Sequence, residues 1–287
     1  MKQFLTLNDL QNFDAQVALA KEIKANPYQF EELGKRKTLG LLFFNPSLRT
    51  RLSTQKAGRL LGMDVMVMNF SNEAWAIEYE DKTIMEGLRS EHVKEATQVV
   101  SQYCDVVGIR AFATLTDKEK DESEQVLQKF IQYASVPILN MESATAHPLQ
   151  ALADALTLTE LSLPKKPKVV LTWAPHPKAL PHAVGNSFAR MMEHQDADFV
   201  IANPEGYDLD PRITKDIPVV HNQAEALKGA DVVYAKNWSS YDSYGQILRT
   251  DNEWMLTPEK MAATNNAAFM HCLPLSLIHI SEPTRPC

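Results

Sequence analysis

The 287-residue chain has few cysteines and no long apolar run, and each shortage excludes a class of protein. Cys104, Cys272 and Cys287 stand far apart, so they predict neither a disulfide framework nor a metal site and fit a reducing, cytoplasmic compartment. No apolar stretch approaches the roughly 18–20 residues that span a bilayer. The polar residues 1–13 are unlike a signal peptide. A formal net charge of −7 argues against nucleic acid or an anionic membrane as the main partner.

Glycine-rich nucleotide loops are also missing, because no G-x-G-x-x-G follows any predicted strand. A dinucleotide-binding domain is therefore not expected, although strands and helices alternate along the chain. With 45% hydrophobic and 23% charged residues, the composition is that of a globular protein. The length suits two domains, and we place their boundary near residue 150. The alternation predicts a parallel α/β sheet in each.

The most informative stretch is Thr38–Gly62. Its apolar residues 39–44 predict a buried strand, residues 45–47 predict a turn with a helix N-cap, and the following periodicity predicts a helix. Free N–H groups and the helix dipole favour an anion at such a helix start. Arginine adds a bidentate fork suited to phosphate. The alternative is that Arg49 and Arg51 are solvated residues of an ordinary helix.

Further polar residues follow two later strands. The predicted strand 105–110 ends in Arg110, and Glu142 follows the predicted strand 136–141. His147 and Gln150 lie at the start of a helix that begins near Pro148. Ligands bind at the carboxyl ends of strands in doubly wound sheets, so we expect these residues near the Ser47 helix start. A lone histidine in such a loop is more often structural than catalytic.

The segments SLRTR (47–51) and HPLQ (147–150) resemble the Ser-x-Arg-Thr-Arg and His-Pro-x-Gln carbamoyl-phosphate motifs of the transcarbamylases. The resemblance extends to about residue 274, and FFNPSLRTR is similar to the branch that acts on N-acylated ornithine. It implies two parallel-sheet α/β domains of the transcarbamylase type, a carbamoyl-phosphate domain at 1–150 and a Rossmann-like ornithine domain at 151–274. It also implies carbamoyl transfer from carbamoyl phosphate to the δ-amine of an N-acyl-L-ornithine in arginine biosynthesis, without a metal or cofactor.

The same resemblance assigns roles to individual residues. Thr50, Arg110 and His147 are the expected donors to the carbamoyl oxygen, which gains negative charge during the reaction. The amide nitrogen needs an acceptor, either Gln150 or the backbone near residues 272–273. The catalytic set is Arg49, Thr50, Arg110, His147 and Gln150. The carbamoyl-phosphate set is Ser47, Leu48, Arg49, Thr50, Trp75, Arg110, His147, Gln150, Cys272 and Leu273.

Trp75 lies in the polar, irregular stretch 71–91. The resemblance implies that a tryptophan there reaches the active site of a neighbouring subunit, and hence a homotrimer with shared active sites. The alternative is that Trp75 fills a core.

The acylornithine residues that the resemblance implies are Glu142, His176, Asn186, Lys236 and Ser90. Ordinary ornithine enzymes carry an aspartate after the strand equivalent to residues 231–236, and this chain has Lys236. An aspartate pairs with the cationic α-amine of ornithine, whereas acylation leaves only the α-carboxylate charged, which suits a lysine. Alternatively, Lys236 is a surface lysine.

The acyl group is predicted from Ser90. In the family, glutamate at this place accompanies acetyl and proline accompanies succinyl. Serine matches neither, but it carries no charge that would repel a succinyl carboxylate, so we expect N-succinylornithine over N-acetylornithine. The alternative functions are an ordinary ornithine carbamoyltransferase and a catalytically silent metabolite-binding paralogue.

The last thirteen residues, LSLIHISEPTRPC (275–287), depart from the family. They match the in-frame translation of a widely used sequencing adapter. We therefore expect a non-native tail after residue 274, the alternative being a short natural one.

Overall fold

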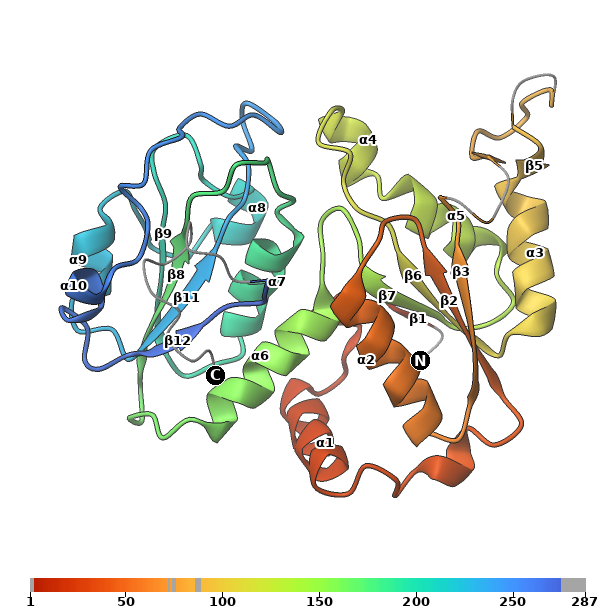
Figure 1. Ribbon diagram of the computed structural model, residues 1–287, viewed down its shortest axis with the longest axis horizontal. Coiled ribbons are helices and arrows are strands. Elements are labelled where there is room, and N and C mark those ends of the chain that lie inside the picture. The colour runs from red at the N-terminus through yellow and green to blue at the C-terminus, as the bar shows by residue number, and fades with distance from the viewer. Residues whose placement is uncertain (1–2, 72, 74–75, 86–88, 275–287) are drawn as a thin grey trace. The chain divides into compact units, whose positions relative to one another are not determined.

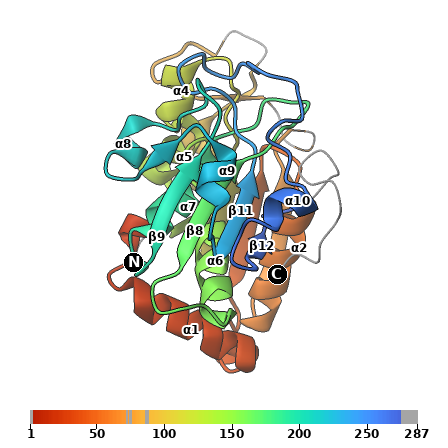
Figure 2. The same cartoon turned by 90° about the vertical axis from the view of Figure 1, so that its left-hand side faces the viewer.

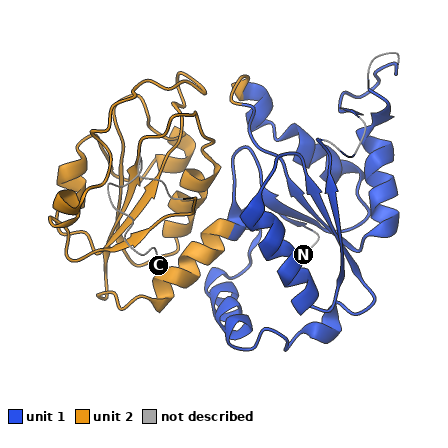
Figure 3. Cartoon of the chain, viewed as in Figure 1, with its two compact units in different colours: residues 1–114, 119–149 blue, residues 115–118, 150–287 orange. Residues whose placement is uncertain are grey.

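A computed structural model describes residues 3–71, 73, 76–85 and 89–274. Trp75 and the segment 275–287 lie outside these residues. The chain divides into two compact units, residues 1–114 with 119–149 and residues 115–118 with 150–287 (Figure 3). Within the described residues, no helix is both long and apolar enough to cross a lipid bilayer.

The first unit is built on a five-stranded parallel sheet in the order β1-β7-β6-β2-β3. Its central strands are buried on both faces, as expected for a parallel sheet covered by helices. The strands are β1 (Gln3–Phe4), β2 (Thr38–Phe43), β3 (Asp64–Asn69), β6 (Val106–Arg110) and β7 (Ile138–Glu142).

Helices cover both faces of this sheet, with α2 on one face and α3 and α5 on the other (Figure 1). The helices are α1 (Phe13–Ala25), α2 (Leu48–Leu60), α3 (Val93–Tyr103), α4 (Lys118–Glu122) and α5 (Gln125–Tyr133), with 3₁₀ turns at Leu7–Asp9 and Glu31–Leu33. The stretch expected to be a loop contains two short strands, β4 (Ile77–Glu78) and β5 (Glu91–His92), which pair in parallel.

Local sequence explains why α2 starts and ends where it does. Ser47 is the N-cap, and its hydroxyl accepts a hydrogen bond from the Thr50 backbone N–H at 3.2 Å. Gly62 follows the helix with φ +77°, the left-handed conformation that glycine adopts without steric cost. Gly58 packs so closely against β2 and β3 that an added Cβ would lie 2.8 Å from Val65 and 3.0 Å from Leu39.

The second unit is also a five-stranded parallel sheet, in the order β10-β9-β8-β11-β12, and Figure 2 shows β9, β8, β11 and β12 side by side in that order. Helices α9 and α10 lie on one face and α7 on the other (Figures 1 and 2). The strands are β8 (Lys168–Trp173), β9 (Asp198–Ala202), β10 (Val219–Val220), β11 (Val232–Lys236) and β12 (Ala268–Met270). The helices are α6 (Pro148–Glu160), α7 (Ala183–Met192), α8 (Pro211–Thr214), α9 (Gln223–Leu227) and α10 (Pro258–Met261).

The predicted fold class, two parallel-sheet α/β domains, is confirmed. Strand order is what creates a binding edge in each unit. In the first unit the chain runs from β2 to β3 on one side and then crosses to β6 on the other side of β2. In the second unit β8 stands in the same relation to β9 and β11. Segments leaving the carboxyl ends of such neighbouring strands diverge, and ligands of open α/β sheets bind in the opening.

Candidate active site

At the opening between β2 and β6, the first turn of α2 meets the end of β6. Arg110, the last residue of β6, donates a hydrogen bond from Nη1 to Thr50 Oγ1 at 3.2 Å. Ser47 lies at the cap of the same turn. Leu48 and Arg49 are exposed there, whereas Arg51 donates to Asn69 Oδ1 at 3.1 Å. Two candidate residues far apart in sequence, Thr50 and Arg110, therefore lie in contact.

Arg110 also belongs to a buried ion pair with Glu142, the last residue of β7. Arg110 is 6% exposed and Glu142 is 8% exposed, so solvent screens the pair poorly. Glu142 Oε2 lies 3.3 Å from Nε2 of His147. The Arg110 guanidinium also stacks on the Phe112 ring, 4.2 Å from its centroid. This cluster unites three of the residues that the sequence proposed from separate segments.

Burial and the neighbouring carboxylate shift the pKa of Arg110 in opposite directions. Burial lowers the pKa of Arg110, and the charge and hydrogen bond of Glu142 oppose that shift. Its Nε–H is buried and has no hydrogen-bond acceptor among the described residues. A buried, unsatisfied guanidinium N–H is costly, so the site favours an acceptor oxygen beside Arg110.

Asn45 is a residue of this site that the sequence reasoning treated only as part of a turn. Its Oδ1 accepts a hydrogen bond of 2.6 Å from the backbone N–H of Phe112. This bond ties the loop after β2 to the loop after β6, and so fixes the spacing between Thr50 and Arg110. The signal was an asparagine placed between a strand and a Pro-Ser helix cap, where its side chain readily bonds to backbone.

In the second unit, the corresponding opening lies between β8 and β11. Lys236 is the last residue of β11, and His176 follows β8. Lys236 is 9% exposed and donates from Nζ to the Asn237 carbonyl at 2.7 Å. The interpretation of Lys236 as a surface lysine is therefore wrong. Asn237 Nδ2 donates to the Ala174 carbonyl at 2.7 Å, which joins the ends of the two strands. His176 is half-buried, and its Nδ1 accepts from the Lys178 backbone N–H at 3.0 Å.

The remaining candidate site residues lie on α6 and α7, after β12 and before β5. Asn186 is 6% exposed on α7, and its backbone N–H bonds to the His182 carbonyl at 2.8 Å. Gln150 lies in the first turn of α6. Cys272 and Leu273 follow β12, and Ser90 is exposed immediately before β5. Trp75 is outside the described residues.

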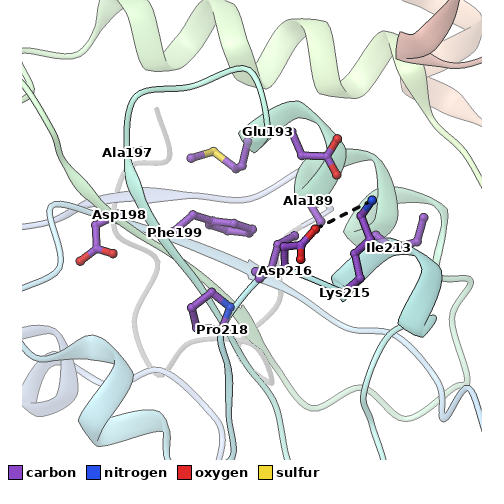
Figure 4. A pocket seen from close by; sticks show the side chains of 11 residues that line it. Ala189, Glu193, Ala197, Asp198, Phe199, Ile213, Lys215, Asp216 and Pro218 are labelled. Carbon is purple, nitrogen blue, oxygen red and sulfur yellow. Dashed lines mark ion pairs between the residues drawn. The ribbon is translucent and has the colours of Figure 1, made fainter.

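A cavity of about 550 Å³ in the second unit lies elsewhere (Figure 4). It is lined by Ala197 and Phe199 at the amino end of β9, and by Lys215 and Asp216, whose charged groups are 3.8 Å apart. Lys236 and His176 follow carboxyl ends of strands, so this cavity is not part of the candidate site. Among the described residues, no three His, Cys, Asp or Glu side chains gather in a way that suits a metal ion.

Comparison with known families bears on both units. Residues 2–160 match the carbamoyl-P binding domain of aspartate/ornithine carbamoyltransferase, and residues 182–279 match its Asp/Orn binding domain. The chain belongs to the aspartate/ornithine carbamoyltransferase family. The predicted family membership is thereby confirmed, and the enzyme class is that of the carbamoyltransferases.

Individual members of this carbamoyltransferase family are similar over nearly the whole chain. N-succinylornithine carbamoyltransferase of Bacteroides thetaiotaomicron is 50% identical over 277 residues, covering 96% of this chain and 87% of that protein. N-acetylornithine carbamoyltransferase of Xanthomonas campestris pv. campestris is 38% identical over 298 residues, with the same two coverages. A glutamate-to-serine variant of N-acetyl-L-ornithine transcarbamylase, crystallised with carbamyl phosphate and N-succinyl-L-norvaline, superimposes with a TM-score of 0.91 at 36% identity, covering 98% of this chain and 91% of that one.

Proposed function

We propose that this carbamoyltransferase moves the carbamoyl group of carbamoyl phosphate to the δ-amine of an N-acyl-L-ornithine, with N-succinyl preferred to N-acetyl. The products are N-acyl-L-citrulline and phosphate, and the reaction serves arginine biosynthesis. The observation that carries the proposal is the 50% identity to an N-succinylornithine carbamoyltransferase across 96% of the chain, against 38% to an N-acetylornithine enzyme.

The first unit holds the groups that carbamoyl phosphate requires. Ser47, Arg49 and Thr50 stand at a helix N-terminus, where N–H groups and cationic side chains suit phosphate oxygens. Arg110 and His147 supply donors for the carbamoyl oxygen as negative charge develops on it. Attack by a deprotonated δ-amine then releases phosphate, which takes up a proton. Positioning and electrostatics supply most of the rate in this scheme.

The second unit supplies the groups for the acceptor. Lys236 is buried, so solvent screens its attraction for an α-carboxylate less than it would for an exposed lysine. Asn186 provides an amide for the acyl end, and we place His176 in the same region. Glu142, from the first unit, is the carboxylate that suits the δ-amino end of the substrate. An acylated α-nitrogen carries no charge, and this matches the lysine where ordinary ornithine enzymes use an aspartate.

The preference for succinyl rests on Ser90. A serine has no charge to repel the second carboxylate of a succinyl group. In the structural neighbour described above, replacement of a glutamate by serine accompanies an N-succinyl ligand. Ser90 occupies the place at which the family resemblance associates glutamate with acetyl substrates.

We also propose a cytoplasmic homotrimer in which Trp75 reaches the active site of a neighbouring subunit. Among the described residues Cys104 is a buried free cysteine, which is consistent with a reducing compartment. Exposed apolar residues on α2, Leu48 and Leu52, offer surface for a second copy of the chain. Light scattering at several protein concentrations measures the mass, and a monomer throughout would contradict the trimer.

Initial rates of citrulline formation test the function. The purified protein is given carbamoyl phosphate with N-succinylornithine, N-acetylornithine or ornithine, and kcat/KM is compared. We expect the order succinyl, acetyl, ornithine. A tenfold preference for acetyl would remove the succinyl assignment, and activity on ornithine alone would identify an ordinary ornithine enzyme. Calorimetric binding of carbamoyl phosphate without turnover would support a silent paralogue.

A further inference from the structure

Helix α6 buries a carboxyl group that the proposed chemistry does not use. Asp154 is 4% exposed, and its helix neighbours Ala151, Ala155 and Leu158 are buried apolar residues. Taking a carboxylate out of water is expensive unless partners compensate it. An apolar side chain would pack at this position without that desolvation cost. The presence of a carboxyl group therefore indicates a functional role.

The carboxyl group is bonded to a residue of the proposed site. Gln150 Nε2 donates to Asp154 Oδ1 at 2.8 Å, one helical turn apart on the same face of α6. On the other side, the fully buried Tyr234 of β11 interacts with the same carboxyl. Burial raises the pKa of Asp154 to about 7, and its interactions with Gln150 and Tyr234 oppose the shift.

The hydrogen bond between Gln150 and Asp154 sets the orientation of the Gln150 amide, that is, the sides to which its NH₂ group and its oxygen point. The Gln150 amide turns its NH₂ group toward Asp154, and the ionised form of the carboxyl, which only accepts hydrogen bonds, holds it in that orientation. Its Oε1 atom then points to the other side. The nitrogen of carbamoyl phosphate carries two N–H donors and needs an acceptor, which Oε1 is. A reversed amide would present N–H groups to N–H groups.

We infer that Asp154 is a positioning residue, which holds the Gln150 amide with its oxygen directed at the carbamoyl nitrogen. The inference rests on the proposed role of Gln150 in binding carbamoyl phosphate. Asp154 itself touches no substrate in this account. We expect its effect on binding to fall on carbamoyl phosphate and to act through Gln150, and these two properties make the inference testable.

The test compares three variants of residues on α6. Asp154→Leu replaces the acceptor with an apolar side chain, Asp154→Asn keeps the size and an acceptor oxygen, and Thr157→Val is the matched control. Within the described part of the chain, the hydrogen bond of Thr157 Oγ1 goes to the Ala153 carbonyl of the same helix, at 2.9 Å. Steady-state kinetics and calorimetry with carbamoyl phosphate are measured together, so that binding is known even without turnover. Thermal unfolding shows that each variant is folded.

Asp154→Leu is expected to weaken the binding of carbamoyl phosphate about tenfold, because one hydrogen bond to this substrate is lost. The KM for N-succinylornithine should change less than about twofold, and Asp154→Asn should recover most of the loss, because the aligned acceptor acts on only one substrate. Thr157→Val should behave as the unmodified protein. Asp154→Leu should unfold at a higher temperature, so the weaker binding cannot be ascribed to poor folding.

A second substitution separates positioning from structure. In a Gln150→Ala background, adding Asp154→Leu should cause no further loss, because the group it orients is gone. An equal loss in both backgrounds, or equal losses for both substrates, would overturn the inference. If Gln150→Ala leaves carbamoyl phosphate affinity unchanged, the role of Gln150 fails and this inference with it. If Gln150→Ala weakens binding and Asp154→Leu does not, only the positioning role is overturned.

Discussion

Removal of the buried carboxylate beside Arg110 gives the sharpest prediction about the first unit. In Glu142→Ala, the guanidinium of Arg110 keeps Thr50 Oγ1 at 3.2 Å and the Phe112 ring at 4.2 Å but loses its counter-ion. Breaking one partner of a buried pair costs about 3–5 kcal/mol of unfolding free energy. The two surviving contacts place this variant near the lower end, at about 3 kcal/mol.

The matched control is an ion pair that solvent screens. Lys35 and Glu32 lie 3.2 Å apart with side chains 64% and 82% exposed. Glu32→Ala should therefore cost less than about 1 kcal/mol. A third variant, Arg110→Met with Glu142→Leu, removes both charges and should recover most of the loss, since apolar replacement of a buried pair is nearly neutral.

The measurement must report on the first unit alone. Trp173, Trp238 and Trp254 lie in the second unit, so tryptophan fluorescence follows mainly that unit. Hydrogen exchange of the β2, β6 and β7 amides, followed in increasing urea, reports the first unit directly. If Glu142→Ala destabilises these strands no more than Glu32→Ala does, the cluster is not a desolvated ion pair and the reasoning fails.

Four further predictions concern activity and pH. Arg49→Ala should raise the KM for carbamoyl phosphate and lower kcat. The combined fall in kcat/KM should correspond to about 2–5 kcal/mol of transition-state stabilisation, and near-normal kinetics would exclude Arg49 from the site. Lys236→Ala should raise the KM for the acylornithine at least about tenfold without changing calorimetric affinity for carbamoyl phosphate, because one charged contact to the carboxylate is lost. Ser90→Glu should shift kcat/KM from N-succinylornithine toward N-acetylornithine by about tenfold or more, and an unchanged ratio would refute the role of Ser90. Finally, burial raises the pKa of Asp154 to about 7, above the value near 4 of an unfolded chain. The stability of the folded protein should therefore fall as pH rises between about 4 and 7, and Asp154→Asn should flatten that part of the urea-measured stability curve.

Elements with a strong local pattern were predictable from sequence. The predicted strands at 105–110 and 136–141 lie within two residues of the bounds of β6 and β7. Their apolar runs and flanking turn residues act over a few residues, so no knowledge of the tertiary structure is needed. The strand and helix on either side of Ser47 were predictable for the same reason.

Elements without such a pattern were missed. Strands β1 and β12 have two and three residues, too few for any periodicity, and exist because a neighbouring strand offers hydrogen bonds. Helix α4 is made wholly of charged residues and has no apolar face. The Arg110–Glu142 ion pair depends on β6 and β7 being neighbours, which strand order decides and local sequence does not. The Gln150–Asp154 spacing, by contrast, was readable as a pair four residues apart on a helix.

The Arg110–Glu142 ion pair has one more consequence. An anion that binds Arg110 competes with the carboxylate of Glu142, which already pairs with the guanidinium. The affinity of the anion therefore reflects the difference between its own contact with Arg110 and the contact of Glu142. Added salt screens a buried contact little. Occupancy at Arg110 should therefore respond weakly to ionic strength, whereas the proposed attraction of phosphate by the exposed Arg49 should depend strongly on salt. The rate at which the ligand is captured would then depend on salt, and the strength with which it is retained would not.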